Sequence, residues 1–317
     1  MNILVTGAAG FIGSYLVEAL LENKEIRVVG LDNFNDYYEP EIKRKNCETA
    51  LRNDRYTLVE GDILDEELLG TLFQKYQFKR LFHLAARAGV RPSIEQPKLY
   101  GDVNIRGSLN LLECARKYKT EKLIMASTSS IYGNNKKTPF SESDPVNEPI
   151  SPYAATKRAM ELLSYNYHHL YGLPIACVRF FTVYGPRQRP DMAIHKFTKM
   201  INDGVPLPVF NKGLSARDFT YVDDIIQGLL GIEKHDFEFD IINLGESQTI
   251  STLDLIKVIE SRLGKIADLT LMPAQPGDVD LTFADISKAR TKYNYKPKVL
   301  IEEGINRFVT WYEEINK

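Results

Sequence analysis

Three side chains stand at a spacing that suits the transfer of a proton from a hydroxyl group. Tyr153 and Lys157 are four residues apart in SPYAATKRAM, and Thr128 precedes the tyrosine by 25 residues. Ser151-Pro152 predicts a helix start, so Tyr153 and Lys157 would lie one turn apart on one face. A phenol has an ordinary pKa of about 10, which a neighbouring ammonium group and a helix N-terminus both lower. We therefore predict that Tyr153 is a general base and that Thr128 shares a hydrogen bond with its oxygen.

A second motif at the start of the chain predicts a dinucleotide site. In TGAAGFIGS the residues Gly7, Gly10 and Gly13 are spaced by three, between an apolar run and a helical pattern. Such glycines let the backbone approach a pyrophosphate that rests on the helix N-terminus. Asp32, nineteen residues beyond Gly13, is placed to accept hydrogen bonds from a ribose and to repel a 2′-phosphate, which favours NAD over NADP. With an oxidised nicotinamide present, Tyr153 would remove a proton while hydride leaves the same carbon.

The elements that must position these residues follow from the alternation of apolar runs and helical patterns. Apolar strands without alternation, separated by helices, predict a Rossmann-type α/β fold with a doubly wound parallel sheet. We expect an NAD-binding domain over 1–180 and a smaller α/β substrate domain over 181–317, with some segments returning to the first. The strand-like runs are NILVTG, IRVVGLD, YTLVEGD, RLFHLAA, KLIMAS and IACVRFF, and the helical patterns include 14–24, 65–76, 103–118 and 301–315.

Composition excludes several classes of function. The 317 residues include 44% hydrophobic and 26% charged residues, with 40 basic against 42 acidic side chains, so no nucleic-acid or membrane partner is expected. Three scattered cysteines predict neither a disulfide framework nor a metal site. The chain opens on a strand pattern with no signal peptide, and it holds no apolar run of about 18 residues. A cytoplasmic protein is therefore expected.

Taken together, the motifs resemble the extended short-chain dehydrogenase/reductase family over essentially the whole chain. The matching stretches are TGAAGFIGS, GDI at 61–63, HLAA at 83–86, STSSIYG, YAATK, RFFTVYGP and ARDFTYVDD. The resemblance implies a catalytic trio of Thr128, Tyr153 and Lys157, with Asp62 and Ile63 beside the adenine. The NAD contacts that it implies are Gly7, Gly10, Phe11, Ile12, Gly13, Asp32, Asn33, Asp62, Ile63, Leu84, Ala85, Ala86, Asn104, Tyr153, Lys157 and Phe180.

The same resemblance implies a nucleotide-diphosphate sugar in the second domain. Arg217 matches the arginine that grips the diphosphate, and PVF at 208–210 matches the stretch against the uracil; a guanidinium suits a phosphate because it can bind in a bidentate manner. The expected substrate contacts are Arg91, Thr128, Ser129, Ser130, Thr182, Arg187, Arg189, Val209, Phe210, Arg217, Gln275 and Asp278.

Two hydroxyls stand where related enzymes carry acids. Sugar-nucleotide 4,6-dehydratases hold an Asp-Glu pair in the slot of Ser129-Ser130, and UDP-glucuronate decarboxylases place a glutamate at Ser130. Neither acid is present here. A 4-epimerase needs only to remove and return hydride and a proton at carbon 4, so the hydroxyls favour epimerisation.

The stretches 87–93, 179–193 and 272–279 resemble UDP-glucuronate 4-epimerases, which implies conversion of UDP-glucuronate to UDP-galacturonate. Thr182, Ser129 and Ser130 would form a hydroxyl cluster suited to the sugar carboxylate. Arg187, Arg189 and Arg91 are candidates to add charge, and the residues leave the choice among them open.

Other functions stay as alternatives. A UDP-glucose or UDP-N-acetylhexosamine 4-epimerase is one, because the small Thr282 leaves room beside the sugar; a UDP-glucuronate decarboxylase and a non-catalytic NAD-binding regulator are less favoured. His83 lies in an apolar run and is expected to be a packed core residue. By resemblance, the helices at 102–118 and 153–170 would form a four-helix interface in a homodimer.

Overall fold

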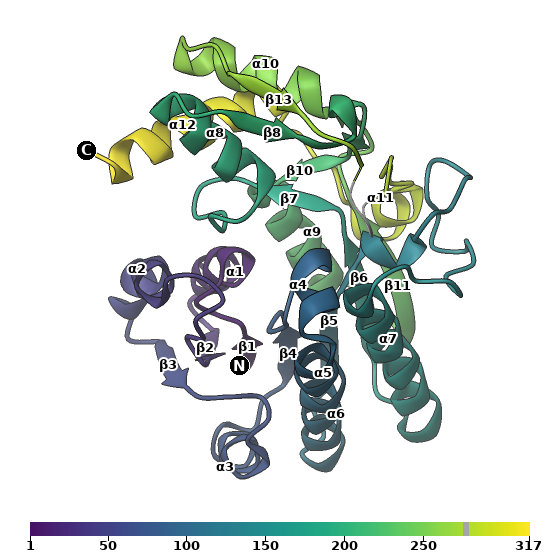
Figure 1. Cartoon of the computed structure of the whole chain (residues 1–317). Helices are drawn as coiled ribbons and strands as arrows, with labels where there is room; N and C mark the ends of the chain where they lie inside the picture. Colours follow the sequence, from purple (N-terminus) through teal and green to yellow (C-terminus); the bar gives the residue numbers. More distant parts are fainter. Residues whose placement is uncertain (275–278) are drawn as a thin grey trace.

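The centre of the molecule is a seven-stranded sheet, seen in a computed structural model that describes residues 1–274 and 279–317 (Figure 1). The strand order is β3-β2-β1-β4-β5-β6-β11, and all six neighbouring pairs run parallel. The order reverses beside β1, which is where open α/β sheets bind their ligands. The strands are β1 Asn2–Thr6, β2 Arg27–Asp32, β3 Tyr56–Glu60, β4 Arg80–His83, β5 Lys122–Thr128, β6 Ile175–Phe180 and β11 Phe239–Leu244.

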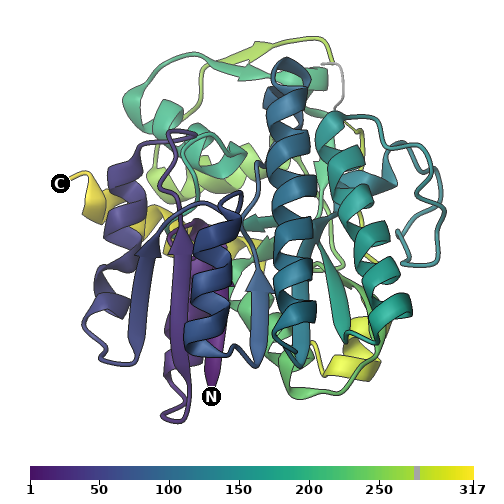
Figure 2. The ribbon, with the colours of Figure 1, turned by 90° about the horizontal axis from the view of Figure 1, so that it is seen from below.

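Both faces of the sheet are buried, which explains the unbroken apolar runs of its strands. Along β1, Ile3 and Val5 join the apolar cluster of one face, whereas Leu4 joins the cluster of the other. Helices α1 and α9 pack on the first face and α3, α6 and α7 on the second; Figure 2 shows α6 and α7 side by side. The predicted fold class is confirmed. The helices of these layers are α1 Phe11–Leu21, α2 Pro40–Leu51, α3 Glu66–Tyr76, α6 Gly107–Lys117, α7 Pro152–Tyr171 and α9 Val222–Lys234.

Helix α7 begins where the sequence predicts. The Ser151 hydroxyl accepts a hydrogen bond from the Ala154 amide at 3.2 Å, and Pro152 occupies the first turn. The helix ends at Gly172, which has the left-handed backbone (φ +67°) that glycine adopts without strain. This start places Tyr153 and Lys157 at the carboxyl end of β5.

Beyond residue 180 the chain forms a second part over the carboxyl end of the large sheet (Figure 1). Three two-stranded sheets and the packed helices α8, α10 and α12 build it. However, β11 pairs with β6 and so belongs to the large sheet. The elements are β7 Thr182–Tyr184 with β10 Phe219–Tyr221, β8 Leu207–Val209 with β13 Leu269–Leu271, β9 Ala216–Arg217 with β12 Ile250–Ser251, α8 Ala193–Asp203, α10 Thr252–Leu263, α11 Ser287–Tyr293 and α12 Ile301–Ile315.

Short helical segments complete the described chain. They are α4 Val90–Glu95, α5 Pro97–Gly101, the π-helix η1 Asp102–Arg106, and the 3-10 helices η2 Ser129–Tyr132 and η3 Phe210–Gly213. Among the described residues, no helix combines the length and the apolar character that a membrane crossing would need.

Candidate active site

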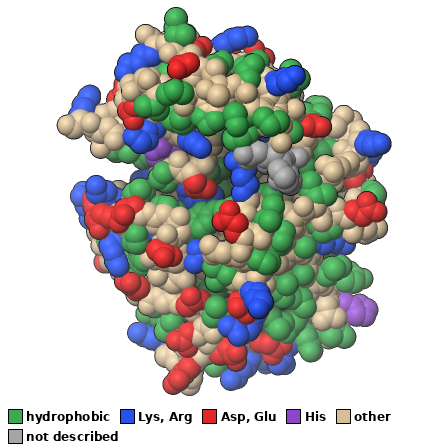
Figure 3. Space-filling view, in the orientation of Figure 1, with side chains coloured by type: hydrophobic (Ala, Val, Ile, Leu, Met, Phe, Trp, Pro, Cys, Tyr) green, Lys and Arg blue, Asp and Glu red, His purple; other side chains and the backbone are tan. Residues whose placement is uncertain are grey.

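A cavity of about 350 Å³ lies at the carboxyl end of the sheet, and the surface is hollowed between the two parts of the molecule (Figure 3). The turn between β1 and α1, the ends of β2, β4 and β5, and the start of α7 all contribute to its wall. The predicted site residues that line it are Gly7, Gly10, Phe11, Ile12, Gly13, Asp32, Asn33, Asp62, Ile63, Leu84, Ala85, Ala86, Thr128, Tyr153, Lys157, Phe180 and Arg189.

The glycine turn leaves no space for side chains. Gly7 has φ +71°, and a Cβ there would lie 2.7 Å from the Ala85 amide nitrogen. A Cβ on Gly13 would lie 2.0 Å from the Gly7 carbonyl oxygen, inside any real contact distance. The backbone therefore faces the cavity at the N-terminus of α1, where a helix binds a phosphate group. The turn fits a dinucleotide diphosphate.

We expect Gly13→Ala to displace this turn and to reduce NAD affinity at least about tenfold, because the bound diphosphate depends on the backbone of the turn. The matched control is Gly70→Ala in α3, where a Cβ would meet nothing within 4 Å. Calorimetric titration of both variants with NAD, beside their melting temperatures, measures the effect. Equal NAD affinities in the two variants would contradict this account.

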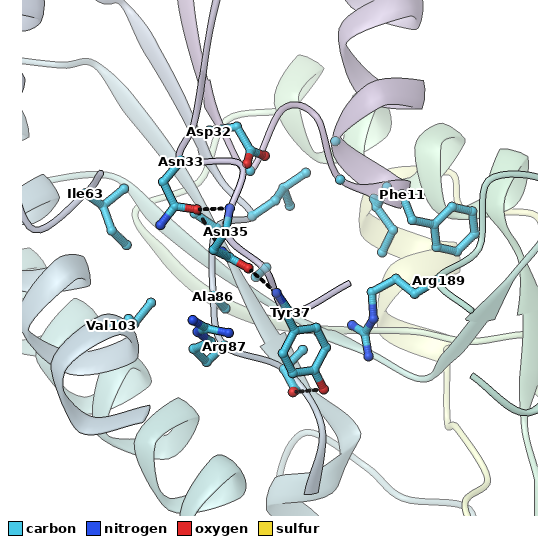
Figure 4. A pocket seen from close by; sticks show the side chains of 18 of the residues that line it. Phe11, Asp32, Asn33, Asn35, Tyr37, Ile63, Ala86, Arg87, Val103 and Arg189 are labelled. Carbon is cyan, nitrogen blue, oxygen red and sulfur yellow. Dashed lines mark hydrogen bonds between the residues drawn. The ribbon is translucent and has the colours of Figure 1, made fainter. Parts of the chain in front are cut away.

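Asp32 stands at the end of β2 with its carboxylate held by the backbone (Figure 4). One oxygen accepts from the Ala9 amide at 3.1 Å and the other from the Phe34 amide at 3.0 Å. Burial raises the pKa of this carboxyl group, while those two hydrogen bonds and the charge of Lys43 oppose the rise. Each oxygen keeps acceptor capacity for a ribose hydroxyl. Nearby, the side-chain amide of Asn33 donates to the Asp62 carboxylate at 2.7 Å.

Several lining residues were not predicted from the sequence, and three of them, Asn35, Tyr37 and Tyr38, lie in the loop after Asp32. The ring of Tyr37 lies between two guanidinium groups, 5.7 Å from that of Arg87 and 5.1 Å from that of Arg189 (Figure 4). Its hydroxyl donates to the Ala88 carbonyl at 2.8 Å. The paired tyrosines in NDYYEP directly after Asp32 were the available signal. The missed residues include Asn35, Tyr37, Tyr38, Lys43, Arg87, Ala88, Ser127 and Met192.

The predicted proton-transfer residues meet at one end of the cavity. Burial raises the pKa of Tyr153, whereas its hydrogen bond with the Thr128 hydroxyl and the nearby charge of Arg189 lower it. The Lys157 ammonium, one turn beyond Tyr153, donates to the Ala126 carbonyl at 2.8 Å. Burial lowers the pKa of Lys157 to about 8. Together, Thr128, Tyr153 and Lys157 can hold a sugar hydroxyl, and Tyr153 can remove its proton.

The three arginines proposed for the sugar carboxylate lie in different places. Arg189 lines the cavity, with Nε and Nη2 each donating to Asp191 at 2.9 Å. Arg187 turns away from the cavity and pairs with Glu18 on α1 at 3.0 Å. The guanidinium of Arg91 lies 5.0 Å from the ring centre of Phe210, beyond the cavity wall. Only Arg189 of these three lies beside Tyr153.

The hydroxyl residues of the predicted cluster lie next to the cavity. Thr128 Oγ donates to Ser130 Oγ at 3.2 Å, which links the catalytic threonine to the 3-10 turn η2. Ser129 is buried in the same turn, and Thr182 begins β7 with its amide donating to the Asp218 carbonyl at 3.0 Å. Of these residues, only Thr128 is part of the lining.

Other predicted contacts lie further from the cavity. Asn104 lies behind it, where its side chain binds both the amide and the carbonyl of Arg87 at 2.9 and 3.0 Å. Val209 is buried in β8, and Arg217 donates to the Ala216 carbonyl at 3.0 Å. His83 is buried between Thr6 and Ser108, as expected of a core residue. Gln275 and Asp278 lie outside the described residues.

Comparison with known proteins places this site in a family. The profile of the GDP-mannose 4,6-dehydratase family matches residues 4–308. The chain belongs to that family, within the extended short-chain dehydrogenases/reductases. The chain carries the Thr128, Tyr153 and Lys157 that the resemblance implies as the catalytic trio, but Ser129 and Ser130 stand where the resemblance places the acids of a dehydratase.

Its relatives include epimerases. A UDP-glucuronate 4-epimerase of Thermodesulfobacterium geofontis is 46% identical over 98% of this chain and 96% of its own length. The crystal structure of UDP-glucuronic acid 4-epimerase from Bacillus cereus, in complex with UDP-glucuronic acid and NAD, matches with a TM-score of 0.94, 39% identity and coverage of 99% and 100% of the two chains. A UDP-glucose 4-epimerase of Thermotoga maritima, with UDP-glucose, matches with a TM-score of 0.92 and 33% identity over the full length of both chains.

Proposed function

We propose that the protein is an NAD-dependent UDP-sugar 4-epimerase that converts UDP-glucuronate to UDP-galacturonate. The observation that carries this proposal is that Tyr153, Thr128 and Lys157 line the same cavity as the glycine turn, with hydroxyls in place of acids at 129 and 130. The relatives that act on UDP-sugars support it.

The residues of the cavity fit NAD, and each has a separate role in binding the cofactor or in the reaction. The glycine turn receives the diphosphate, and Asp32 receives the adenosine ribose. NAD, when bound, supplies a hydride acceptor that also returns the hydride. Tyr153 as phenolate takes the proton of the carbon-4 hydroxyl, and it gives the proton back after the keto sugar has turned its other face. Thr128 holds the reacting oxygen, and the net reaction consumes neither hydride nor proton.

The keto intermediate of a uronic acid must be protected from decarboxylation. A 4-keto uronic acid is a β-keto acid and loses carbon dioxide readily, so its carboxylate has to be held without a proton donor of carboxylic type. We propose that the hydroxyls of Ser129, Ser130 and Thr182 bind it and that Arg189 adds the positive charge. Arg189 is the candidate among the arginines because it lines the cavity and its charge acts on Tyr153.

Proton NMR of the purified protein with UDP-glucuronate tests the proposal, with UDP-glucose and UDP-N-acetylglucosamine in parallel tubes. We expect UDP-galacturonate to appear without added reductant and the neutral sugars to turn over more slowly. A UDP-pentose would mean decarboxylation instead. Turnover of a neutral sugar alone would move the assignment to the alternative epimerases, which the small, buried Thr282 accommodates. Bound NAD without turnover of any sugar would indicate a regulator.

The remaining predictions concern organisation. We propose that residues 181–317 form the UDP-sugar-binding domain apart from α9 and β11, which return to the NAD-binding domain. We also propose that the protein is cytoplasmic. We also propose a homodimer through α6 and α7, since α7 exposes Leu162 and Tyr165 by more than half of their surface. Light scattering behind gel filtration would measure the mass, and a monomer at micromolar concentration would contradict the dimer.

A further inference from the structure

The end of β5 is fastened to α7 at three consecutive residues. The Ala126 carbonyl accepts from Lys157 at 2.8 Å, and the Thr128 hydroxyl acts on the Tyr153 phenol, whose pKa it lowers. Between them, Ser127 Oγ donates to Glu161 Oε1 at 2.7 Å. The helix residues of these contacts are four apart, so one face of α7 carries all three. Ser127 thus sits between the two catalytic contacts, and its own contact depends on Glu161.

Glu161 is a fully buried carboxylate with a complete set of donors. Besides Ser127, it accepts from Arg179 through Nε and Nη2, both at 2.9 Å, and from Arg158 at 3.0 Å. Arg179 is itself 1% exposed and donates its remaining terminal nitrogen to the Tyr132 hydroxyl at 2.9 Å. Buried ion pairs of this kind are costly to form, and removing one partner is strongly destabilising because it leaves a buried charge unpaired.

Glu161 is an ionised side chain that acts on the charge of Lys157. On the neighbouring strands, burial lowers the pKa of His83 on β4 to about 3 and raises that of Cys177 on β6 to about 12, so both are neutral near pH 7. On α7 itself, Glu161 is one turn beyond Lys157 and favours its charged form. Arg179 on β6 stands behind Glu161, and Arg158 approaches it from the partly exposed side of α7.

We propose that Glu161 is a positioning residue for the reaction: it fixes Ser127 between the two catalytic contacts and balances Arg179 so that Lys157 keeps its ammonium form. This inference rests on the proposed function only in its consequence for turnover. The fixing of Ser127 and the charge of Lys157 are properties of the protein without substrate.

The variant Glu161→Gln separates charge from position. The glutamine oxygen still accepts from Ser127, but the Arg179 cation loses its counter-charge. A positive charge favours the neutral amine, so the pKa of Lys157 falls, and the ammonium is lost at a lower pH. A charge within about 4–6 Å of a titratable group shifts its pKa by about one to three units. The alkaline limb of the kcat profile should therefore move to lower pH by about one unit or more.

Two further variants make the test specific. Arg179→Met leaves Glu161 with Arg158 as its remaining cationic partner, at 3.0 Å, and removes a positive charge near Lys157. The Lys157 pKa should therefore move upward, opposite to Glu161→Gln. The double variant Glu161→Gln with Arg179→Met removes both charges and should bring it back toward the wild-type value. Because the two single variants shift in opposite directions, the failure of one of them to fold leaves the other as a test. Ser127→Ala should lower kcat without moving the alkaline limb, since no charge changes.

The experiment follows the ¹³C shift of the Lys157 Cε carbon against pH in lysine-labelled holoenzyme, with the kcat profile measured in parallel. Opposite displacements of the Lys157 midpoint in the single variants, reversed in the double variant, would support the inference. If the Lys157 midpoint in both folded single variants stays within about 0.3 pH units of the wild-type midpoint, the inference is overturned. A pair of residues that only stabilises the fold would give that result. If the midpoints move but no UDP-sugar turns over even in the wild type, the proposed function fails and the charge balance stands.

Discussion

Replacing Tyr153 by phenylalanine is expected to reduce turnover by about two to four orders of magnitude, which is the usual contribution of a general acid or base. The substitution removes one oxygen. The ring keeps its edge-to-face contact with Tyr100, whose centre lies 6.2 Å away. Because the glycine turn and Asp32 are untouched, NAD should still bind. The loss should therefore fall on kcat, measured by NMR with UDP-glucuronate at saturating concentration.

The matched control is Tyr171→Phe, which makes the same change at an exposed position at the end of the same helix, beyond the predicted interface at 153–170. Its turnover should equal that of the wild type. In the wild type, activity should rise with pH as the Tyr153 phenol ionises, because only the phenolate accepts the proton. Residual turnover of the Tyr153 variant within tenfold of the wild type would mean that another group is the base.

The parts of the site that can be predicted from the sequence are those that follow from local geometry. The glycine spacing, the Tyr-Lys pair and the unbroken apolar strands each follow from local geometry, because a turn, a helix period and a doubly covered sheet require them. These predictions needed no knowledge of distant contacts. The parallel sheet and the start of α7 at Pro152 agree with them, whereas the strand order and the seventh strand, β11, were not predicted.

The partners of those residues depend on tertiary contacts and could not be predicted in the same way. Lys157 meets a backbone carbonyl of β5, which has no signature in the sequence. Tyr37 reaches Arg87 and Arg189 only after the loop beyond β2 has folded over the cavity. Arg187 and Arg189 are two residues apart, yet only one lines the cavity. The reason is local: Arg187 has φ +65°, a left-handed backbone that sequence rules do not assign to arginine.

The second large effect is expected for Arg189→Gln. Loss of a charge-assisted hydrogen bond costs about 1.5–3 kcal/mol, which is roughly a 10- to 150-fold loss in kcat/KM for the acidic sugar. A neutral UDP-sugar lacks the carboxylate and should lose much less. The quantity to measure is the ratio of kcat/KM for UDP-glucuronate and UDP-glucose. Arg187→Gln is the control, because Arg187 pairs with Glu18 on α1 and should leave this ratio unchanged.

The pH dependence of Arg189→Gln separates two roles of the same guanidinium. Its positive charge lowers the pKa of Tyr153, so removing it raises that pKa and reduces the phenolate fraction at a given pH below the new value. The acid limb of kcat should move to higher pH with either sugar, because Tyr153 serves both. The change in the sugar ratio should persist above that limb, because the carboxylate contact does not depend on Tyr153. If both sugars lose activity equally and recover together at high pH, Arg189 acts on the base alone, and the sugar carboxylate is held by the hydroxyls of Ser129, Ser130 and Thr182.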